Sequence, residues 1–120
     1  VKGRAVGAQK GGSVKKTMYK LEYQRTALSD MEEIISYISH ELKNPCAADR
    51  LAHEFVAQAE NLRVFPYSNP VYIPLRPLKH EYRKLFVGNF IMFYRTDESK
   101  KLITISRVVY SGRNLSETII

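Results

Sequence analysis

Two apolar stripes of helical period, separated by a link of only two residues, constrain the fold of this chain more than any other feature. In an α-helix, residues three or four positions apart share one face, so such a stripe marks a helix that buries one side. The first stripe consists of Met31, Ile34, Ile35, Ile38 and Leu42. The second is rich in alanine, which lets helices approach closely, and consists of Ala48, Leu51, Ala52, Phe55, Ala59 and Leu62. Because the link at Lys43–Asn44 is so short, the pattern predicts two adjacent, antiparallel helices.

The sequence also indicates where each helix begins. Ser29 and Glu32 have the spacing of a capping box, in which two side chains satisfy backbone amides at the start of a helix, so we expect the first helix to begin at Ser29. Asn44 followed by Pro45 is a cap residue and then a proline at the first helical position, where a missing amide proton has no cost. The helical hairpin is therefore predicted to span residues 29–63.

Strand-like alternation of apolar and polar residues surrounds this hairpin. Before it, Tyr19, Leu21 and Tyr23 alternate with polar residues, which predicts a strand over residues 19–25. After it, four prolines exclude regular structure from residue 66 to about residue 79. Three β-rich runs then follow, at residues 82–87, 90–96 and 102–109.

The last three runs are expected to form a meander. Gly88 and Asn89 suit a tight two-residue turn between the first two runs, because glycine tolerates the positive φ that such a turn requires. The run at residues 102–109 alternates only loosely, which is typical of an interior strand with neighbours on both sides. The resulting order, β-α-α-β-β-β, predicts an α+β fold in which the helical hairpin packs on a small, mostly antiparallel sheet.

The chain length of 120 residues leaves room for one domain. We expect that domain to cover residues 18–120, because residues 1–17 show neither period and hold four of the six glycines. These first residues are interpreted as a disordered leader or as a remnant of an expression vector. A single cysteine, Cys46, excludes an internal disulfide, and the lack of a secretory segment or a long apolar run favours the cytoplasm and excludes a membrane span.

Charge is divided unevenly along the chain, whose formal net charge is +7. Residues 1–17 contribute +5, residues 18–75 contribute −3 and residues 76–120 contribute +5. The basic second half can steer the protein toward a polyanion or toward an acidic protein, without indicating which. His40 and His53 have no metal-ligand type of residue four positions further on, so neither a metal nor another cofactor is expected.

Five segments of the chain, taken in order with these elements, carry a family likeness: MYKLEY at residues 18–23, NPCAADRL at 44–51, Phe65-Pro66, YRKLFVGNFIMFYR at 82–95 and RVVYSGRN at 107–114. On these segments the chain resembles the RelE/ParE superfamily of bacterial type II toxins. The resemblance covers nearly all of residues 18–120 and rests on the ordered set rather than on one motif.

That resemblance implies a toxin that arrests growth unless it is bound by an antitoxin encoded beside it, with plasmid stabilisation among the expected roles. The ParE branch of the superfamily poisons DNA gyrase, and the long helical hairpin is more typical of that branch, so gyrase is the expected target. The alternative is a ribosome-dependent messenger RNA endoribonuclease of the RelE type, which would be an enzyme that needs no metal. A second alternative is a non-toxic protein-interaction module of the same fold. Both a homodimer and a toxin–antitoxin hetero-oligomer remain open.

The resemblance also implies which residues meet the target. The basic pair expected on the first meander strand corresponds to Arg83 and Lys84, and the arginine expected after the last strand corresponds to Arg113. In a RelE-like nuclease such cations orient the scissile phosphate and stabilise its developing charge. Two other positions of the nuclease set depart from the pattern, because Ile91 stands where an arginine is expected and Ile119 stands near the place of an aromatic residue.

Two further residues complete the candidate set. Arg107 lies on the last strand and joins the basic residues named above as a target-binding candidate. His80, beside Glu81, has a side chain that titrates near neutral pH and is the candidate acid or base if the protein is a ribonuclease. The alternative interpretation is that these charged side chains form an ordinary solvated face of a sheet.

Overall fold

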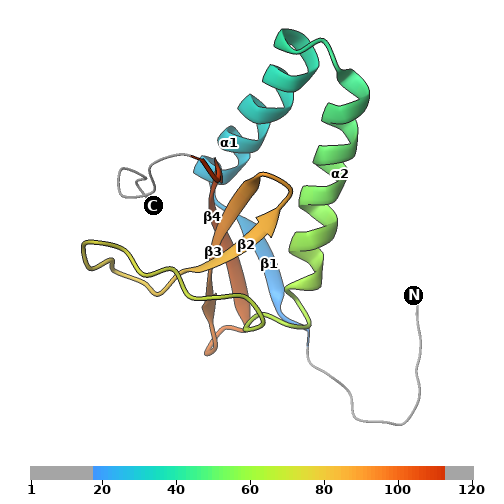
Figure 1. The fold of residues 1–120 in the computed structure, drawn as a ribbon. Helices are drawn as coiled ribbons and strands as arrows, with labels where there is room; N and C mark the ends of the chain where they lie inside the picture. Colours follow the sequence, from blue (N-terminus) through green and yellow to red (C-terminus); the bar gives the residue numbers. More distant parts are fainter. Residues whose placement is uncertain (1–17, 113–120) are drawn as a thin grey trace, which may run out of the picture.

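A computed structural model describes residues 18–112 of the chain (Figure 1). Its elements follow the predicted order, with one π-helical turn added after the first helix: β1 (Lys20–Tyr23), α1 (Arg25–Ser36), η1 (Tyr37–Glu41), α2 (Pro45–Asn61), β2 (Arg83–Val87), β3 (Phe90–Asp97) and β4 (Leu102–Tyr110). The predictions for residues 1–17, for Arg113 and for Ile119 lie outside the described residues. Within residues 18–112, no helix has the length and apolar character needed to cross a membrane.

The four strands form one mixed sheet in the order β1-β4-β3-β2. Strand β1 runs parallel to β4, whereas β3 is antiparallel to both β4 and β2. The prediction of an interior last strand is confirmed, because β4 lies between β1 and β3. Figure 1 shows α1 and α2 side by side, extending beyond the end of the sheet. This is the predicted α+β architecture of a helical hairpin on a mostly antiparallel sheet.

The main core lies between the helices and one face of the sheet. Ala27 of α1 and Phe55 and Ala59 of α2 are at most 1% exposed, and they share a cluster with strand residues that include Met92 and Ile105. The small side chains of Ala27 and Ala59 let the two helices pack closely on the sheet. Burial of a phenylalanine side chain such as that of Phe55 stabilises the fold by about 1.5–3 kcal/mol.

A smaller cluster covers the opposite face of the sheet. Ile91, Phe93 and Val109 are buried there, and Tyr72 packs against them from the segment between α2 and β2. The rings of Tyr72 and Phe93 meet edge to face, with centroids 4.9 Å apart. The proline-rich segment of residues 62–82 forms no helix or strand beyond a single bridge between Val71 and Arg83, which confirms the irregular structure predicted for residues 66–79. Helix α2 ends at Asn61, two residues before its predicted end, and β2 begins one residue later than predicted, at Arg83. Packing of the proline-rich segment on the sheet positions the residues that line the site described below.

The predicted start of the first helix at Ser29 is wrong, because α1 begins one turn earlier, at Arg25. The cap residue is Gln24, which makes no side-chain cap bond, but its backbone N–H donates to the Ile105 carbonyl oxygen at 2.9 Å. The Thr26 hydroxyl donates to the carbonyl oxygen of Ser106 at 2.7 Å. Backbone pairing with β4 therefore carries the chain straight from β1 into the helix, and the capping-box pattern is not used.

The expected continuous helix to Leu42 ends instead in the π-helical turn η1. The backbone N–H of Leu42 donates to the Tyr37 carbonyl oxygen, five residues back, and Lys43 then takes a positive φ of 53°. The cap of α2 is as predicted, because the Asn44 side chain accepts a hydrogen bond from the Ala47 N–H at 3.1 Å. The tight turn at Gly88 is also confirmed by its φ of +57°.

The strands differ from their predicted bounds by a few residues. Strand β1 ends at Tyr23 rather than at residue 25, whereas β3 and β4 each extend one residue further, to Asp97 and Tyr110. A register shift in the β3–β4 ladder leaves Ser106 unpaired, because Phe93 is opposite Arg107 and the next residue of β3 is opposite Ile105. Such a shift redirects neighbouring side chains.

Candidate functional site

The predicted basic pair does not form one patch. Successive residues of a strand point to opposite faces, and the contacts of Arg83 and Lys84 follow this rule. One guanidinium nitrogen of Arg83 donates to the Asn69 carbonyl oxygen at 2.6 Å, and the group lies 5.1 Å from the centroid of the Tyr67 ring. The Lys84 ammonium instead lies 5.8 Å from the ring centroid of Phe86, which is half exposed. The two cations therefore face different surroundings.

Arg107 is held within the fold. Its Nε donates to one carboxylate oxygen of Asp30 at 2.7 Å and its Nη2 donates to the other at 3.0 Å. The two side chains are only 19% and 14% exposed, and the same Asp30 carboxylate accepts the backbone N–H of Val108 at 2.9 Å. Hydrogen bonding to Asp30 raises the pKa of the Arg107 guanidinium. The pair joins α1 to β4, which gives Arg107 a structural partner that the sequence pattern does not reveal.

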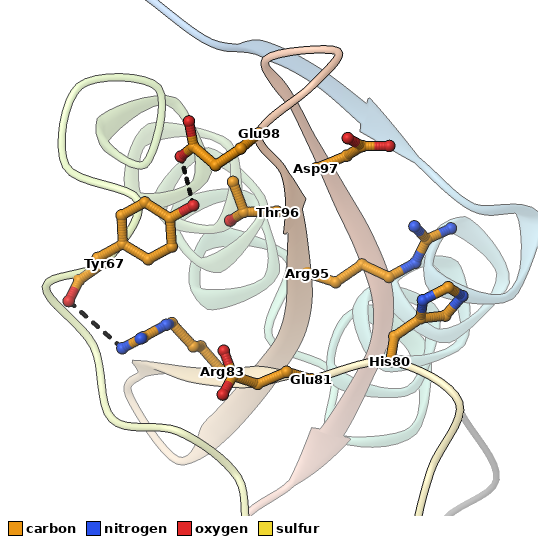
Figure 2. A pocket seen from close by; sticks show the side chains of 8 residues that line it. All are labelled: Tyr67, His80, Glu81, Arg83, Arg95, Thr96, Asp97 and Glu98. Atoms are coloured by element: carbon orange, nitrogen blue, oxygen red, sulfur yellow. Dashed lines mark hydrogen bonds between the residues drawn. The ribbon is translucent and has the colours of Figure 1, made fainter.

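Arg83 and His80 come together in a polar cavity of about 310 Å³, which we call the arginine pocket (Figure 2). Its walls are the segment before β2, the start of β2 and the end of β3 with the turn that follows. The residues that line it are Tyr67, His80, Glu81, Arg83, Arg95, Thr96, Asp97 and Glu98. The pocket thus contains two of the predicted site residues and omits Lys84 and Arg107.

Arg95 is the residue of this pocket that sequence reasoning missed as a candidate. It is the last residue of the YRKLFVGNFIMFYR segment, and nothing in the strand pattern distinguishes it from an ordinary solvated arginine. Its neighbourhood depends on the proline-rich segment, which has no period from which its path can be predicted. Figure 2 shows the Arg95 side chain extending toward the His80 ring, while Arg83 turns toward Tyr67 on the other side of the cavity.

Glu98 is fully engaged by neighbouring donors. Its carboxylate accepts hydrogen bonds from the hydroxyl groups of Tyr19 and Tyr67 and from the Lys101 ammonium, the last at 2.6 Å. These bonds, led by that from Lys101, lower the pKa of Glu98 to about 2. Burial and the hydrogen bond to Glu98 raise the pKa of the Tyr67 hydroxyl well above its usual range. The network joins the start of β1, the proline-rich segment and the β3–β4 turn.

Asp97 is engaged in the turn itself. One carboxylate oxygen accepts the Ser99 hydroxyl at 2.6 Å and the Lys100 backbone N–H at 3.2 Å. The bond from Ser99 is the main reason that the pKa of Asp97 lies below its usual value. Of the three carboxylates that line the pocket, only that of Glu81 has no such bond within the part of the chain that the structure describes.

In contrast to the carboxylates of Asp97 and Glu98, two polar groups of the pocket have no hydrogen-bond partner among the described residues. The Arg95 Nε–H and the Thr96 hydroxyl oxygen are buried and meet no hydrogen-bond partner within residues 18–112. Neither Arg83 nor Arg95 takes part in an ion pair with another described residue. Buried polar atoms are normally paired, and an unpaired one costs about 1–3 kcal/mol. The pocket therefore combines the charges of two arginines that have no ion-pair partner among the described residues with a Glu81 carboxylate that accepts no hydrogen bond from them.

A second concave surface is apolar. It is a groove of about 750 Å³ between the first helix, with its π-helical turn, and the β2–β3 turn. We call it the hairpin groove, and its lining residues are Glu33, Ile34, Tyr37, Ile38, Leu42, Asn89, Phe90 and Tyr110. Tyr37, Leu42 and Tyr110 are each 56% exposed. Apolar side chains gathered on an open surface are typical of a protein-interaction site.

The described part of the chain offers no cluster of three or more His, Cys, Asp or Glu side chains able to hold a metal ion. His40 and His53 instead contact carbonyl oxygens one turn back in their own helices, at Ser36 and Asp49.

Comparison with known proteins gives this arrangement a context. A family model described as the ParE toxin of the type II toxin–antitoxin system parDE matches residues 21–115. The chain is similar in structure to a chain of the chromosomal ParDE system from P. aeruginosa, with a TM-score of 0.61 and 22% identity over 78% of this chain and 97% of that one. It is also similar to a chain of the RelBE2 toxin–antitoxin complex from Mycobacterium tuberculosis, with a TM-score of 0.54 and 20% identity over 80% and 94% of the two chains. No curated protein sequence matches it.

Proposed function

The chain belongs to the ParE family of toxins from type II toxin–antitoxin systems, as its resemblance to the RelE/ParE superfamily predicted, and from this we propose that it arrests bacterial growth by poisoning DNA gyrase. The observation that carries the choice of target is Ile91. This residue stands where the nuclease branch is expected to have an arginine, and its side chain is 3% exposed within an apolar cluster with Phe93 and Val109. A buried isoleucine supplies no charge to a scissile phosphate, which supports gyrase over messenger RNA.

The placement of the other basic residues supports the same choice. Stabilising a pentacovalent phosphate requires several cations directed at one point. Arg83 and Lys84 face different surroundings, and Arg107 is paired with Asp30. The described basic side chains are therefore not directed at one reacting phosphate, and Arg83 and Lys84 are better suited to separate contacts with a protein surface.

The specific observation that favours the ribonuclease alternative is the arginine pocket. Arg83 and His80 line the same cavity, Arg83 on the side of Tyr67 and His80 on the side of Arg95, so a cation and a candidate acid or base face one space. If the protein cleaves messenger RNA on the ribosome, His80 is the candidate acid or base and Arg83 the candidate phosphate ligand.

We further propose that the cognate antitoxin covers the hairpin groove with an apolar segment. Both structurally similar chains come from toxin–antitoxin systems, and the groove offers the apolar surface that an amphipathic helix or strand requires. The basic second half of the chain favours an antitoxin rich in Asp and Glu outside its apolar contact residues.

Overproduction in bacteria tests the proposed function. We expect growth arrest, loss of negative supercoiling in a reporter plasmid and messenger RNA that stays intact at early times. Co-production of the protein encoded by the neighbouring reading frame should restore growth. Site-specific cleavage of messenger RNA before any change in plasmid topology would favour the ribonuclease, and unaffected growth would favour a non-toxic interaction module.

A further inference from the structure

We infer that residues 73–81, which we call the proline arm, insert into an apolar pocket with an acidic rim on the protein that the toxin inhibits. The proposed function identifies that protein as gyrase, so this role of the arm rests on the proposed function. Four features of the arm carry it: exposed aliphatic side chains, a fixed base, a positive charge and a position beside Arg83 and Lys84.

The arm exposes aliphatic side chains that the fold does not use. Ile73 and Leu75 are 85% and 86% exposed and Leu78 is 38% exposed, and none of the three belongs to either buried cluster. Single exposed apolar side chains are common on protein surfaces. Three of them close together on one loop instead form an apolar patch, which is typical of an interaction site.

The base of the arm is fixed on the sheet. The Tyr72 N–H donates to the Tyr82 carbonyl oxygen at 2.8 Å, and the Lys84 N–H donates to the Pro70 carbonyl oxygen at 2.9 Å. The Tyr72 ring also meets the Phe93 ring edge to face, and Tyr82 is buried. Figure 1 shows the loop between these anchors extending away from the sheet and the helices. The aliphatic side chains are therefore presented at a distance from the core by a loop whose two ends are held together.

Two prolines restrict the backbone that carries these side chains. Pro74 and Pro77 have a fixed φ, and each disfavours the helical conformation of the residue before it, Ile73 or Arg76. Residues 73–81 form no helix or strand. A segment that is restricted before it binds loses less conformational entropy on binding. The arm therefore combines exposed apolar surface with a low entropic cost of ordering.

The charge and the chemistry of the arm select a protein as its partner. Arg76 and Lys79 are exposed, and neither forms an ion pair with another described residue. The one acid of the arm, Glu81, lies at its end and lines the arginine pocket. Cations beside aliphatic side chains are complementary to an apolar pocket bordered by carboxylates. Unpaired bases are bound mainly by aromatic side chains, so an aliphatic tip favours a protein over a nucleic acid.

The position of the arm favours the target over the antitoxin. Val71 forms a bridge with Arg83, and the Lys84 N–H donates to Pro70, so the arm begins beside two of the candidates for target contact. No residue of the arm lines the hairpin groove, where we propose that the antitoxin binds. The arm thus extends the surface of Arg83 and Lys84 away from the antitoxin site.

Inhibition of purified gyrase tests this role with a matched pair of substitutions. Leu75→Ser removes an aliphatic side chain of the arm, and Leu28→Ser removes a leucine of α1 that is 50% exposed. We expect Leu75→Ser to raise the toxin concentration that half-inhibits supercoiling by about tenfold or more, because a few apolar anchors dominate binding. Leu28→Ser should leave that concentration unchanged. Ile73→Ser repeats the test at a second position of the arm, and melting temperatures and antitoxin binding show that the variants are folded.

A second pair of substitutions tests the acidic rim of the pocket. Arg76→Gln should weaken inhibition several-fold at low salt and should reduce its dependence on salt, because a long-range attraction is lost. The matched control is Arg50→Gln, at an exposed position of α2, which should change neither. Equal inhibition by the two variants at every salt concentration would overturn the assigned partner.

The remaining outcomes separate the arm from the proposed function. Full inhibition of gyrase by both Leu75→Ser and Ile73→Ser overturns the role of the arm and leaves the proposed function intact. Loss of antitoxin binding in these two variants, with unchanged melting temperatures, overturns it by assigning the arm to the antitoxin.

Growth arrest scores the same variants if the wild-type chain arrests growth without inhibiting gyrase. In that case the proposed function fails. Loss of arrest in Leu75→Ser but not in Leu28→Ser then supports the arm as the contact with another protein target, and arrest by both variants overturns it. A wild-type chain with neither activity overturns both proposals.

Discussion

The carboxylate of Asp30 accepts two hydrogen bonds from the Arg107 guanidinium, at 2.7 and 3.0 Å, and thereby joins α1 to the central strand β4. The same carboxylate satisfies the backbone N–H of Val108 beside the register shift. Strand β1 pairs with β4 only as far as Ile105, so beyond that residue the helix supplies the acceptor for the Val108 N–H. The position of α1, and with it one wall of the hairpin groove, depends on this pair.

Replacing Asp30 is therefore expected to destabilise the protein. Asp30→Asn keeps the shape of the side chain but leaves the Arg107 charge poorly compensated in a site that is mostly buried, so the free energy of unfolding should fall by about 2–4 kcal/mol. Denaturant unfolding measures the change. The control is Asp49→Asn, whose ion pair with His53 is about three-quarters exposed and should change stability by less than about 0.5 kcal/mol. Equal effects of the two substitutions would contradict this role.

Phe55 is expected to be a main support of the core. Its side chain is 1% exposed and meets Phe90 edge to face, with ring centroids 5.9 Å apart. Phe55→Ala should lower the free energy of unfolding by about 3–5 kcal/mol, because it removes the buried ring and leaves a cavity. The neighbouring Val56, which is 52% exposed, is the matched control, and Val56→Ala should cost less than about 1 kcal/mol. A similar loss in both variants would place the core elsewhere.

The comparison of sequence and structure shows which kind of information each element needs. The helical hairpin, the Asn44 cap and the Gly88 turn depend on residues close in the sequence, so their patterns predicted them correctly. The start of α1 depends on backbone pairing between Gln24 and Ile105, which no local pattern encodes. This distant contact determines where α1 begins, although the capping-box pattern at Ser29 is locally favourable.

The residues of the candidate site also differ in whether the sequence could identify them. The family resemblance identified Arg83 as a candidate, and the position of His80 next to Glu81 in the sequence identified the histidine. Neither observation indicated that Arg95 lines the same cavity. That neighbourhood is created where a segment without periodicity crosses the sheet. The structural role of Arg107 was equally hidden, because Asp30 lies far from it in the sequence.

Acid should weaken the contact between the β3–β4 turn and the proline-rich segment. The pKa of Glu98 is lowered to about 2 from its ordinary value of 4.5, so its contribution to stability is present above about pH 4.5 and is lost as the pH falls toward 2. Glu98→Gln should therefore flatten the dependence of the melting temperature on pH between about pH 5 and pH 2. Glu41→Gln, at an exposed position in η1, serves as the control. An unchanged pH profile in Glu98→Gln would show that the network contributes nothing to stability.

The hairpin groove should be the surface that the antitoxin covers. Leu42→Glu places a charge at a groove position that is 56% exposed, so it should weaken antitoxin binding by about tenfold or more while changing the melting temperature little. Ile73→Glu introduces the same charge at an 85% exposed isoleucine that does not line the groove, and should leave binding intact. Binding is measured with the protein encoded by the neighbouring reading frame. Loss of affinity in the Ile73 variant but not in the Leu42 variant would place the antitoxin on the segment before β2.

The most direct test of the proposed target measures supercoiling of relaxed plasmid by purified gyrase as the toxin concentration is raised, beside an assay of messenger RNA on programmed ribosomes. We predict that the wild-type chain inhibits supercoiling, that the antitoxin relieves the inhibition and that the messenger RNA remains intact. Full gyrase activity at every toxin concentration, together with site-specific messenger cleavage that Arg113→Ala abolishes, would contradict the account and identify the protein as a ribosome-dependent nuclease.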